Sequence, residues 1–376
     1  MSKWEWKKLG EVYDFTRGLT YSKKDEVESS SNCILRSNNI DLQTNSINLD
    51  ELKYIKDEIA IPQEKYVRKN TILICMSNGS KAHLGKVAYI DKDYDFAFGG
   101  FMGLLKPKCE INGKFVHLYL CSDEYKNFIK SLSDGANINN LKFDDLRKFE
   151  IPFPPLSEQK RIVKFLDEEF SKIETLKTNA ETNLKNAKEL FESELRKTFG
   201  NPIWKKKNFS DLFKLKSGEY LNSKDISEGE YPVYGGNGII AFHNKYNLNG
   251  ANVIIGRVGA LCGNVRFISD PIWLTDNAFR IVFQTDEIDC LFATYLLNFL
   301  NLRSYARQAA QPVISNASLK DVSIPLPPLS VQKEIVARLD KLSENVKRLE
   351  ANYKQNIANC DELKKSILKK TFEGES

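Results

Sequence analysis

The chain has 376 residues, of which 41% are hydrophobic and 28% charged, and its formal net charge is +5. A chain of this length accommodates two or three domains, and its mild positive charge permits nucleic-acid binding without requiring it. The seven cysteines form no Cys-x-x-Cys pair, so a zinc site is not expected. Scattered cysteines, an N-terminus unlike a signal peptide and no long apolar run indicate a cytoplasmic protein without a membrane span.

Residues 1–150 are expected to form a β-rich globular domain. Short apolar runs at 71–75 and 86–90 are separated by turns rich in Ser, Asn and Gly, which is typical of short strands. Residues 115–129, toward the end of this region, have the pattern of a helix.

Residues 200–323 follow the first region weakly but in the same order. Residues 232–239 parallel 33–40, and Gly218 falls where Gly18 predicts a glycine. The run 252–257 parallels 71–74, and 291–302 supplies the matching helix. The two regions are therefore expected to share one fold and to differ in their surfaces.

Two nearly identical blocks follow the two regions. Residues 151–160 read Ile-Pro-Phe-Pro-Pro-Leu-Ser-Glu-Gln-Lys, and residues 324–333 read Ile-Pro-Leu-Pro-Pro-Leu-Ser-Val-Gln-Lys. Prolines hold the preceding residues extended, so each block is expected to begin as an extended strap. Ser157 and Ser330 are expected to cap two long helices, because no proline or glycine follows for about forty residues.

The apolar residues of both long helices recur at three- and four-residue steps, which is a near-heptad stripe. We expect the two stripes to bury each other in an antiparallel coiled coil, since the first helix must deliver the chain into the second domain. The alternative is that each helix packs only on its neighbouring domain. The expected interface residues are Leu166, Ile173, Leu176, Leu184, Leu190, Leu339, Val346, Leu349, Ile357 and Leu363.

This organisation predicts an α+β protein with a pseudo-twofold internal repeat. Its expected parts are a domain at 1–150, a strap and helix at 151–199, a domain at 200–323, and a strap and helix at 324–376.

Two variable globular regions, each followed by an Ile-Pro-x-Pro-Pro-Leu-x-x-Gln block and a long helix, resemble the specificity (S) subunit of type I restriction-modification systems. The resemblance covers essentially the whole chain, although the second globular region is shorter than the first. It implies that each globular region is a target-recognition domain reading one half of a bipartite double-stranded DNA target. It also implies that the paired helices act as a spacer and dock two methyltransferase subunits.

The resemblance further implies that this chain is not an enzyme and binds no cofactor. The partner methyltransferase would bind S-adenosylmethionine and methylate adenine, and restriction subunits with ATP and Mg would cleave unmodified DNA. The sequence agrees, because it contains no Asn/Asp-Pro-Pro-aromatic tetrapeptide and no Gly-x-x-x-x-Gly-Lys-Ser/Thr loop. The glycine-rich stretch 98–103 has the wrong spacing for a cofactor loop.

Polar and basic side chains in the turns are candidate DNA contacts, because they can read base edges in the major groove or hold phosphates. Arg36 and Arg257 would suit guanine, while Asn38 and Asn237 would suit adenine. Turn asparagines also serve backbone conformation, and surface lysines are often only solvated. The candidates are Arg36, Ser37, Asn38, Ser77, Asn78, Lys81, Lys86, Asn237, Lys245, Arg257, Arg266, Arg303 and Arg307.

Two other classes of function remain open at this point. The chain could be a coiled-coil scaffold whose globular ends bind proteins, which predicts negligible DNA affinity even with partners present. A self-contained restriction–methylation enzyme is disfavoured by the missing methyltransferase motifs. Two similar readers related by a pseudo-twofold axis would read half-sites about one helical turn (~34 Å) apart on the same side of the duplex.

Overall fold

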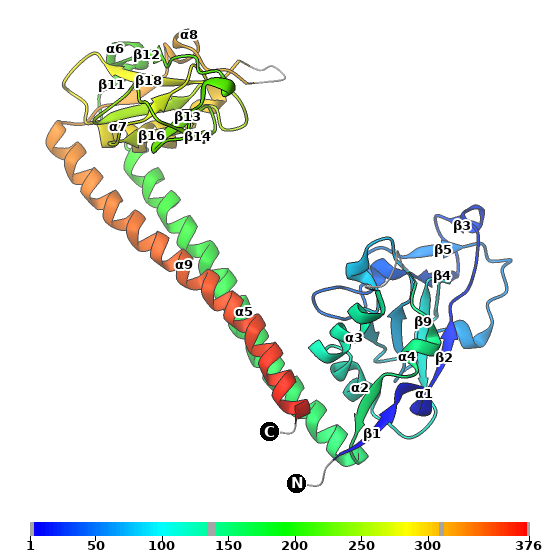
Figure 1. The fold of residues 1–376 in the computed structure, drawn as a ribbon. Coiled ribbons are helices and arrows are strands. Elements are labelled where there is room, and N and C mark those ends of the chain that lie inside the picture. The colour runs from blue at the N-terminus through cyan, green and yellow to red at the C-terminus, as the bar shows by residue number, and fades with distance from the viewer. Residues whose placement is uncertain (1–3, 134–139, 308–311, 374–376) are drawn as a thin grey trace. The chain divides into compact units, whose positions relative to one another are not determined.

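The computed structural model describes residues 4–133, 140–307 and 312–373, and it divides into two compact units. Each unit contains one β-rich globular domain and part of each of two long helices, α5 (Leu156–Phe199) and α9 (Leu329–Glu373) (Figure 1). Unit 1 comprises Met1–Asn179 and Asn356–Ser376, and unit 2 comprises Ala180–Gln355. The fold is α+β, as predicted.

The first globular domain contains two four-stranded sheets. One runs in the order β2 (Tyr13–Arg17), β9 (Met102–Pro107), β6 (Ile72–Cys75) and β7 (Val87–Tyr89), with all neighbours antiparallel. The other runs in the order β3 (Glu26–Val27), β5 (Lys53–Ile55), β4 (Asn32–Leu35) and β8 (Phe96–Phe98). Its last pair, β4 and β8, is parallel.

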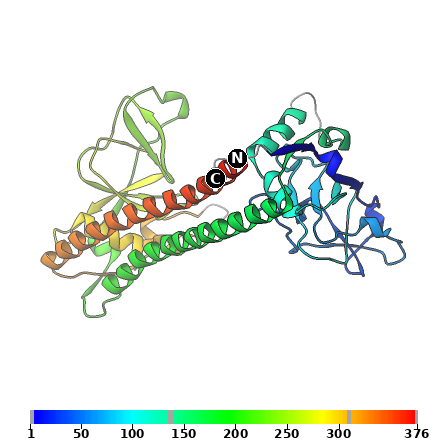
Figure 2. The same cartoon turned by 90° about the horizontal axis from the view of Figure 1, so that it is seen from below.

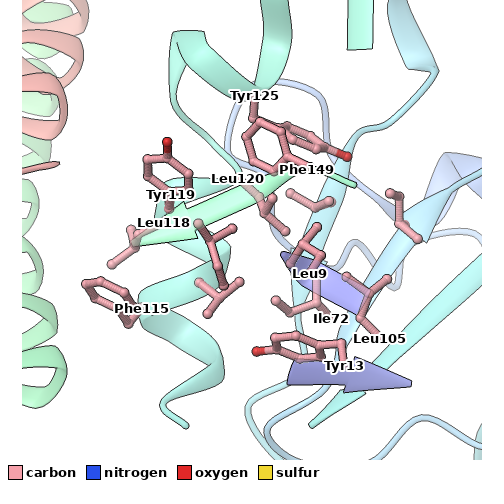
Figure 3. Packing of buried hydrophobic residues seen from close by; sticks show 14 of the residues in the cluster. Leu9, Tyr13, Ile72, Leu105, Phe115, Leu118, Tyr119, Leu120, Tyr125 and Phe149 are labelled. Carbon is pink, nitrogen blue, oxygen red and sulfur yellow. The ribbon is translucent and has the colours of Figure 1, made fainter. Parts of the chain in front are cut away.

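The core of this domain has two layers because successive side chains of a strand point to opposite faces of the sheet. Ile72 and Ile74 of β6 pack in one cluster with Leu105 and Phe115 (Figure 3). Leu73 and Cys75 of the same strand pack in a second cluster. All four residues of β6 are buried, which explains why this strand reads as a continuous apolar run.

Helices cover the side of the sheet on which Ile72 lies. The expected helix at 115–129 is two helices, α2 (Gly113–Tyr119) and α3 (Asp123–Ser133). Asn112 caps α2, because its Oδ1 accepts from the backbone N–H groups of Lys114 and Phe115. The short helices are α1 (Leu9–Val12) and α4 (Phe143–Leu146).

The second globular domain repeats the strand order of the first. One sheet runs β12 (Phe213–Ser217), β18 (Ala278–Phe283), β15 (Asn252–Gly256) and β16 (Val265–Ile268), and all its neighbours are antiparallel. The other runs β14 (Gly238–His243), β13 (Tyr231–Gly235) and β17 (Trp273–Leu274), with β13 and β17 parallel. The helices are α6 (Phe209–Leu212), α7 (Cys290–Phe299) and α8 (Asn316–Leu319). The prediction that both regions share one fold is confirmed.

The proline-rich straps form edge strands that close each domain. In unit 1, β10 (Glu150–Phe153) pairs antiparallel with β1 (Glu5–Lys8). In unit 2, β19 (Ser323–Pro325) pairs antiparallel with β11 (Lys206–Asn208). Proline tolerates these positions because each sheet has only two strands.

The expected serine caps are wrong by two residues, since Pro155 and Pro328 occupy the cap positions. The helices begin at Leu156 and Leu329, so Ser157 and Ser330 lie inside the first turn. The reason is that the preceding proline carbonyls accept the first intrahelical bonds, from Gln159 N to Pro155 O in α5 and from Gln332 N to Pro328 O in α9.

The glutamine of each repeated block attaches its long helix to the adjacent domain. Gln332 is fully buried; its Oε1 accepts from Asp289 N at 2.8 Å, and its Nε2 donates to Glu287 O and Pro327 O, both at 2.8 Å. Asp289 in turn caps α7. In unit 1, Gln159 accepts from Asn112 N at 2.9 Å. The duplicated glutamine therefore fixes each long helix against the capped start of a domain helix.

We expect Gln332→Leu to destabilise the chain by about 3 kcal/mol, since it leaves three backbone groups, one buried and two part-buried, without a partner at about 1 kcal/mol or more each. Gln159→Leu should cost less, because it removes only the bonds to Asn112 N and Pro154 O. Urea unfolding of the full chain measures both changes. The exposed Gln43→Leu is the control, and equal stability of all three variants would contradict this function of the glutamines.

The two long helices pack antiparallel within each unit (Figure 2). In unit 1, Glu174 pairs with Lys364 at 2.6 Å and Lys177 pairs with Asp361 at 2.8 Å. From the first ion pair to the second, the residue number rises on α5 and falls on α9. The two helices therefore run antiparallel. In unit 2, Arg338 bonds both Glu194 and Thr198 on α5.

Between the helix ends that pack on the domains, the buried positions of α5 and α9 follow a seven-residue step. They are Leu166, Ile173, Ala180 and Ala187 on α5, and Leu339, Val346 and Cys360 on α9. Leu184 and Ile357, each four residues after a heptad position, are partly buried. The helix ends also pack on the domains, since Leu166 belongs to the core cluster of the first domain and Leu339 to that of the second. The apolar stripes therefore bury each other along the middle of the helices, and each packs on its neighbouring domain at the helix end.

Four of the expected interface leucines lie outside the buried stripe. Leu176 is 58% exposed, Leu190 52%, Leu363 45% and Leu349 36%. Each of these four leucines lies three residues after a position of the seven-residue step, whereas Leu184 and Ile357 lie four residues after one. The buried seam therefore lies on the other flank of the stripe, and these leucines are removed from the predicted coiled-coil interface.

Candidate nucleic-acid interface

The first domain has a hollow of about 750 Å³ at the ends of its strands. Arg36 and Ser37 line this hollow, as two of the sequence candidates. Arg36 lies 3.7 Å from Glu26, which also pairs with Lys53 at 3.4 Å. The lining residues are Arg17, Leu19, Thr20, Tyr21, Lys23, Glu26, Arg36, Ser37, Lys53, Gly99, Gly100, Phe101, Met102 and Asn140. With four cations and one carboxylate, the hollow is electropositive.

Three further candidates lie beside this hollow. Asn78 Nδ2 donates to Ser37 Oγ at 3.0 Å, which joins the turn after β6 to the turn after β4. The backbone N–H of Ser77 donates to Phe101 O at 3.1 Å. Asn38 is exposed, and its Nδ2 lies 3.4 Å from Glu51 O. The structure thus brings Arg36, Ser37, Ser77 and Asn78 together.

Lys81 and Lys86 line a different hollow, of about 480 Å³, beside α3. Lys81 is exposed there. Lys86 is buried, and its ammonium donates to Ile40 O at 2.7 Å, while burial lowers its pKa below the ordinary value. A buried amine already bonded inside the protein cannot reach a phosphate, so Lys86 is removed from the candidate DNA contacts.

Three candidates of the second domain meet at the turn that follows β15. Asn237 Oδ1 accepts from Leu261 N at 3.0 Å, and Arg303 Nη1 donates to Ala260 O. Arg257 opens the same turn; its Nη1 donates to Asp276 O at 3.2 Å. Its guanidinium also lies over the Phe279 ring, 5.3 Å from the ring centre.

The other candidates of this domain are arranged around that turn, with one exception. The Arg266 guanidinium approaches Gly238, next to Asn237 in sequence. Arg307 forms an isolated antiparallel β-bridge with Val313. Val313 forms a second such bridge with Val258, which lies in the turn. Lys245 follows the far end of the six-residue strand β14, so about 20 Å of strand separates it from Asn237.

Sequence reasoning missed residues that share the first hollow, namely Arg17, Lys23, Lys53 and Phe101. Arg17 ends β2, and Lys53 begins β5. The sequence could have indicated the three cations, because each lies at the end of a strand or between strands. A β-rich fold presents such positions to solvent.

The globular domains, straps and antiparallel helices together define a two-domain recognition protein built on a duplicated frame. A family model described as "Type I restriction modification DNA specificity domain" matches residues 1–186 and 202–359. The chain therefore belongs to this family: it is a DNA specificity subunit of a type I restriction-modification system, and such a subunit is itself non-catalytic.

Curated relatives extend over nearly the whole chain. The chain is 28% identical to the "Type I restriction enzyme StySPI specificity subunit" of Salmonella potsdam, over 99% of this chain and 89% of the relative. It is 27% identical to the "Type I restriction enzyme EcoKI specificity subunit" of Escherichia coli K12, over 97% and 87%.

Two solved structures share the fold at 19% sequence identity. One is described as "Structural basis underlying complex assembly and conformational transition of the type I R-M system", with a TM-score of 0.79 over 99% of this chain and 98% of that one. The other is the HsdS subunit from Thermoanaerobacter tengcongensis, with a TM-score of 0.66 over 100% and 98%.

Two negative findings hold for the described residues. No described helix combines the length and apolarity needed to cross a membrane. Within the same residues, His, Cys, Asp and Glu side chains form no group of three that could hold a metal ion.

Proposed function

We propose that each globular domain reads one half of a bipartite double-stranded DNA target, and that the paired helices set the spacing between the halves. The observation that carries this proposal is the duplication of one strand order with different surface side chains in the two copies. A constant frame that presents two different sets of turns suits the reading of two different short sequences.

The charges of the first domain support a nucleic-acid partner. Arg17, Lys23, Arg36 and Lys53 line one hollow against a single carboxylate, Glu26. Lysine and arginine hold phosphates and release counterions, so binding through this surface would weaken as salt rises. The alternative function, a scaffold with protein-binding ends, predicts negligible DNA binding and therefore no salt-dependent DNA affinity.

The exposed leucines of the helices support docking of two methyltransferase subunits. In unit 1, Leu176 lies in sequence between Glu174 and Lys177, which form ion pairs with α9. Leu363 lies in the same way between their partners, Asp361 and Lys364. Both leucines follow a buried position by three residues, so in an antiparallel pair they lie on the same side of the helices. Leu190 and Leu349 repeat this arrangement in unit 2. We name these two pairs the leucine patches.

Two leucine patches related by an internal repeat fit two copies of one partner. Leu176 and Leu190 of α5 correspond to Leu349 and Leu363 of α9 by the repeat. A repeat that conserves exposed apolar side chains offers the same contact twice. The partner subunits would carry S-adenosylmethionine, and the restriction subunits that complete such a complex would carry ATP and Mg.

We expect Leu176→Gln with Leu363→Gln to remove one of the two docked methyltransferase subunits. Docking would bury the exposed half of each leucine, which contributes about 0.8–1.5 kcal/mol, so the loss of both corresponds to about tenfold to a hundredfold weaker binding at that patch. Native mass spectrometry of the assembled complex reports the stoichiometry. Leu42→Gln with Leu49→Gln, which changes two exposed leucines of the first domain, is the control. Retention of two subunits by the patch variant would contradict the docking proposal.

DNA binding by the assembled complex tests the reading function. A competition assay compares duplexes carrying both halves of the target, the first half alone or the second half alone, at several salt concentrations. We expect both single-half duplexes to compete less well than the complete target, and affinity to fall with salt. Equal competition by unrelated DNA, or no DNA binding by a complete complex, would favour the protein-binding scaffold.

A further inference from the structure

The turn that leads into β9 presents one side chain to solvent on a fixed backbone. Met102 N donates to Gly99 O at 2.8 Å, which closes the turn. Phe101 O accepts from Met76 N at 2.9 Å and from Ser77 N at 3.1 Å, so three backbone bonds hold this segment. The Phe101 side chain is nevertheless 72% exposed.

The second domain contains the same turn with a different side chain. Ala278 N donates to Thr275 O at 3.1 Å, which closes the turn leading into β18. Arg257 N donates to Asn277 O at 3.0 Å, as Met76 N does to Phe101 O. Asn277 is therefore the structural equivalent of Phe101, and it is also exposed.

A second set of bonds confirms this equivalence. Leu141 N donates to Met76 O at 2.7 Å in the first domain. Ile314 N donates to Arg257 O at 3.0 Å in the second. Met76 and Arg257 thus each connect the turn to a returning segment in the same way.

The surroundings of Phe101 separate it from an ordinary exposed hydrophobic residue. Single exposed apolar side chains are common and need no explanation. Phe101, however, lines the hollow that holds the four cations and the single carboxylate of the first domain. An aromatic ring on a fixed turn beside groups that hold phosphates is placed to contact a base.

We propose that Phe101 and Asn277 are equivalent specificity-determining residues, one in each domain. Phe101 packs against the methyl group of a thymine in the first half-site. Asn277 makes hydrogen bonds to the edge of an adenine in the second, because apolar side chains favour the thymine methyl and asparagine pairs with adenine. This inference rests on the proposed function that each domain reads one half-site.

Exchange of the two side chains tests the inference in the complex assembled with its methyltransferase subunits. The wild-type target is defined first by mapping N6-methyladenine in cellular DNA. Phe101→Asn should then lower methylation of the wild-type target about tenfold or more and change the preferred base at one position of the first half-site. Asn277→Phe should do the same in the second half-site. In each variant the other half-site should be read unchanged, which shows that the chain is folded.

Removal of a single methyl group isolates the proposed contact. Replacing one thymine of the first half-site by deoxyuridine should weaken binding of the wild-type complex and leave binding of the Phe101→Asn complex unchanged. Phe101→Leu, which keeps an apolar side chain, should retain part of the thymine preference. Leu49→Asn, at an exposed leucine outside the hollow, is the control variant and should behave as the wild type.

The outcomes separate the inference from the proposed function. A wild-type complex that methylates a bipartite target, with both exchange variants keeping its motif and rate, would overturn the inference alone. Equal sensitivity of wild-type and Phe101→Asn complexes to every deoxyuridine would also overturn it. A wild-type complex that methylates DNA without a bipartite motif would overturn the proposed function, and the inference with it.

Discussion

Replacing Gly18 by alanine is expected to unfold the first domain. The added Cβ would lie 2.0 Å from Gly99 O and 2.6 Å from Phe98 O, well inside any real contact. Both obstacles are backbone atoms, and Gly18 N and Leu19 N donate to Met102 O and Phe98 O, so neither side moves without breaking bonds. We expect a loss of about 4–5 kcal/mol or more, which is exceptional for one methyl group.

Gly218→Ala should have the same effect in the second domain. Its Cβ would lie 2.3 Å from Thr275 O and 2.4 Å from Leu274 O. Urea unfolding of the full chain measures both variants. Gly79→Ala is the matched control, since nothing lies within 4 Å of its added Cβ, and its effect should stay within about 1 kcal/mol. Wild-type stability of Gly18→Ala would contradict the close strand contact.

Lengthening both long helices by one heptad is expected to change the target spacing and nothing else. Seven residues inserted after Lys177 and seven before Asp361 preserve the ion pair between those residues. At about 1.5 Å per residue the insertion adds about 10 Å, which corresponds to about three base pairs of DNA. A seven-residue step also keeps the buried stripe in register.

Mapping of N6-methyladenine in cells expressing the lengthened chain with its methyltransferase measures this result. We expect the two half-sites to be unchanged, the unspecified gap to grow by about three base pairs, and the wild-type target to lose methylation. The same heptad appended after Ser376 is the control and should leave the gap unchanged. An unchanged gap in the lengthened chain, or altered half-sites, would show that the helices do not set the spacing.

The long-range organisation was predictable because its signals are local and repeated. The duplicated proline-rich blocks and the heptad steps each lie within one continuous stretch, and a strong period identifies a helix without knowledge of its neighbours. The shared fold of the two globular regions was also predictable, since Gly18 and Gly218 fall at equivalent positions. The structure explains this, because Gly18 touches the turn that leads into β9 and Gly218 touches the turn that leads into β18.

The details that the sequence left open depend on contacts between distant segments. Which flank of the stripe is buried is decided where α5 meets α9, so the leucines at 176, 190, 349 and 363 were assigned to the wrong flank. Lys86 reads as a surface lysine, yet its amine binds Ile40 O, far away in the sequence. Phe101 and Asn277 differ in type, and only the backbone bonds to Met76 and Arg257 show that they are equivalent.

The most direct test of the central claim is a methylome of cells that express this chain together with its methyltransferase subunit. We predict a single new motif of N6-methyladenine with two short specific halves around a fixed unspecified gap. A methylome without such a motif, from cells in which the complex is stable and the methyltransferase is intact, would contradict the account of two domains reading a divided target.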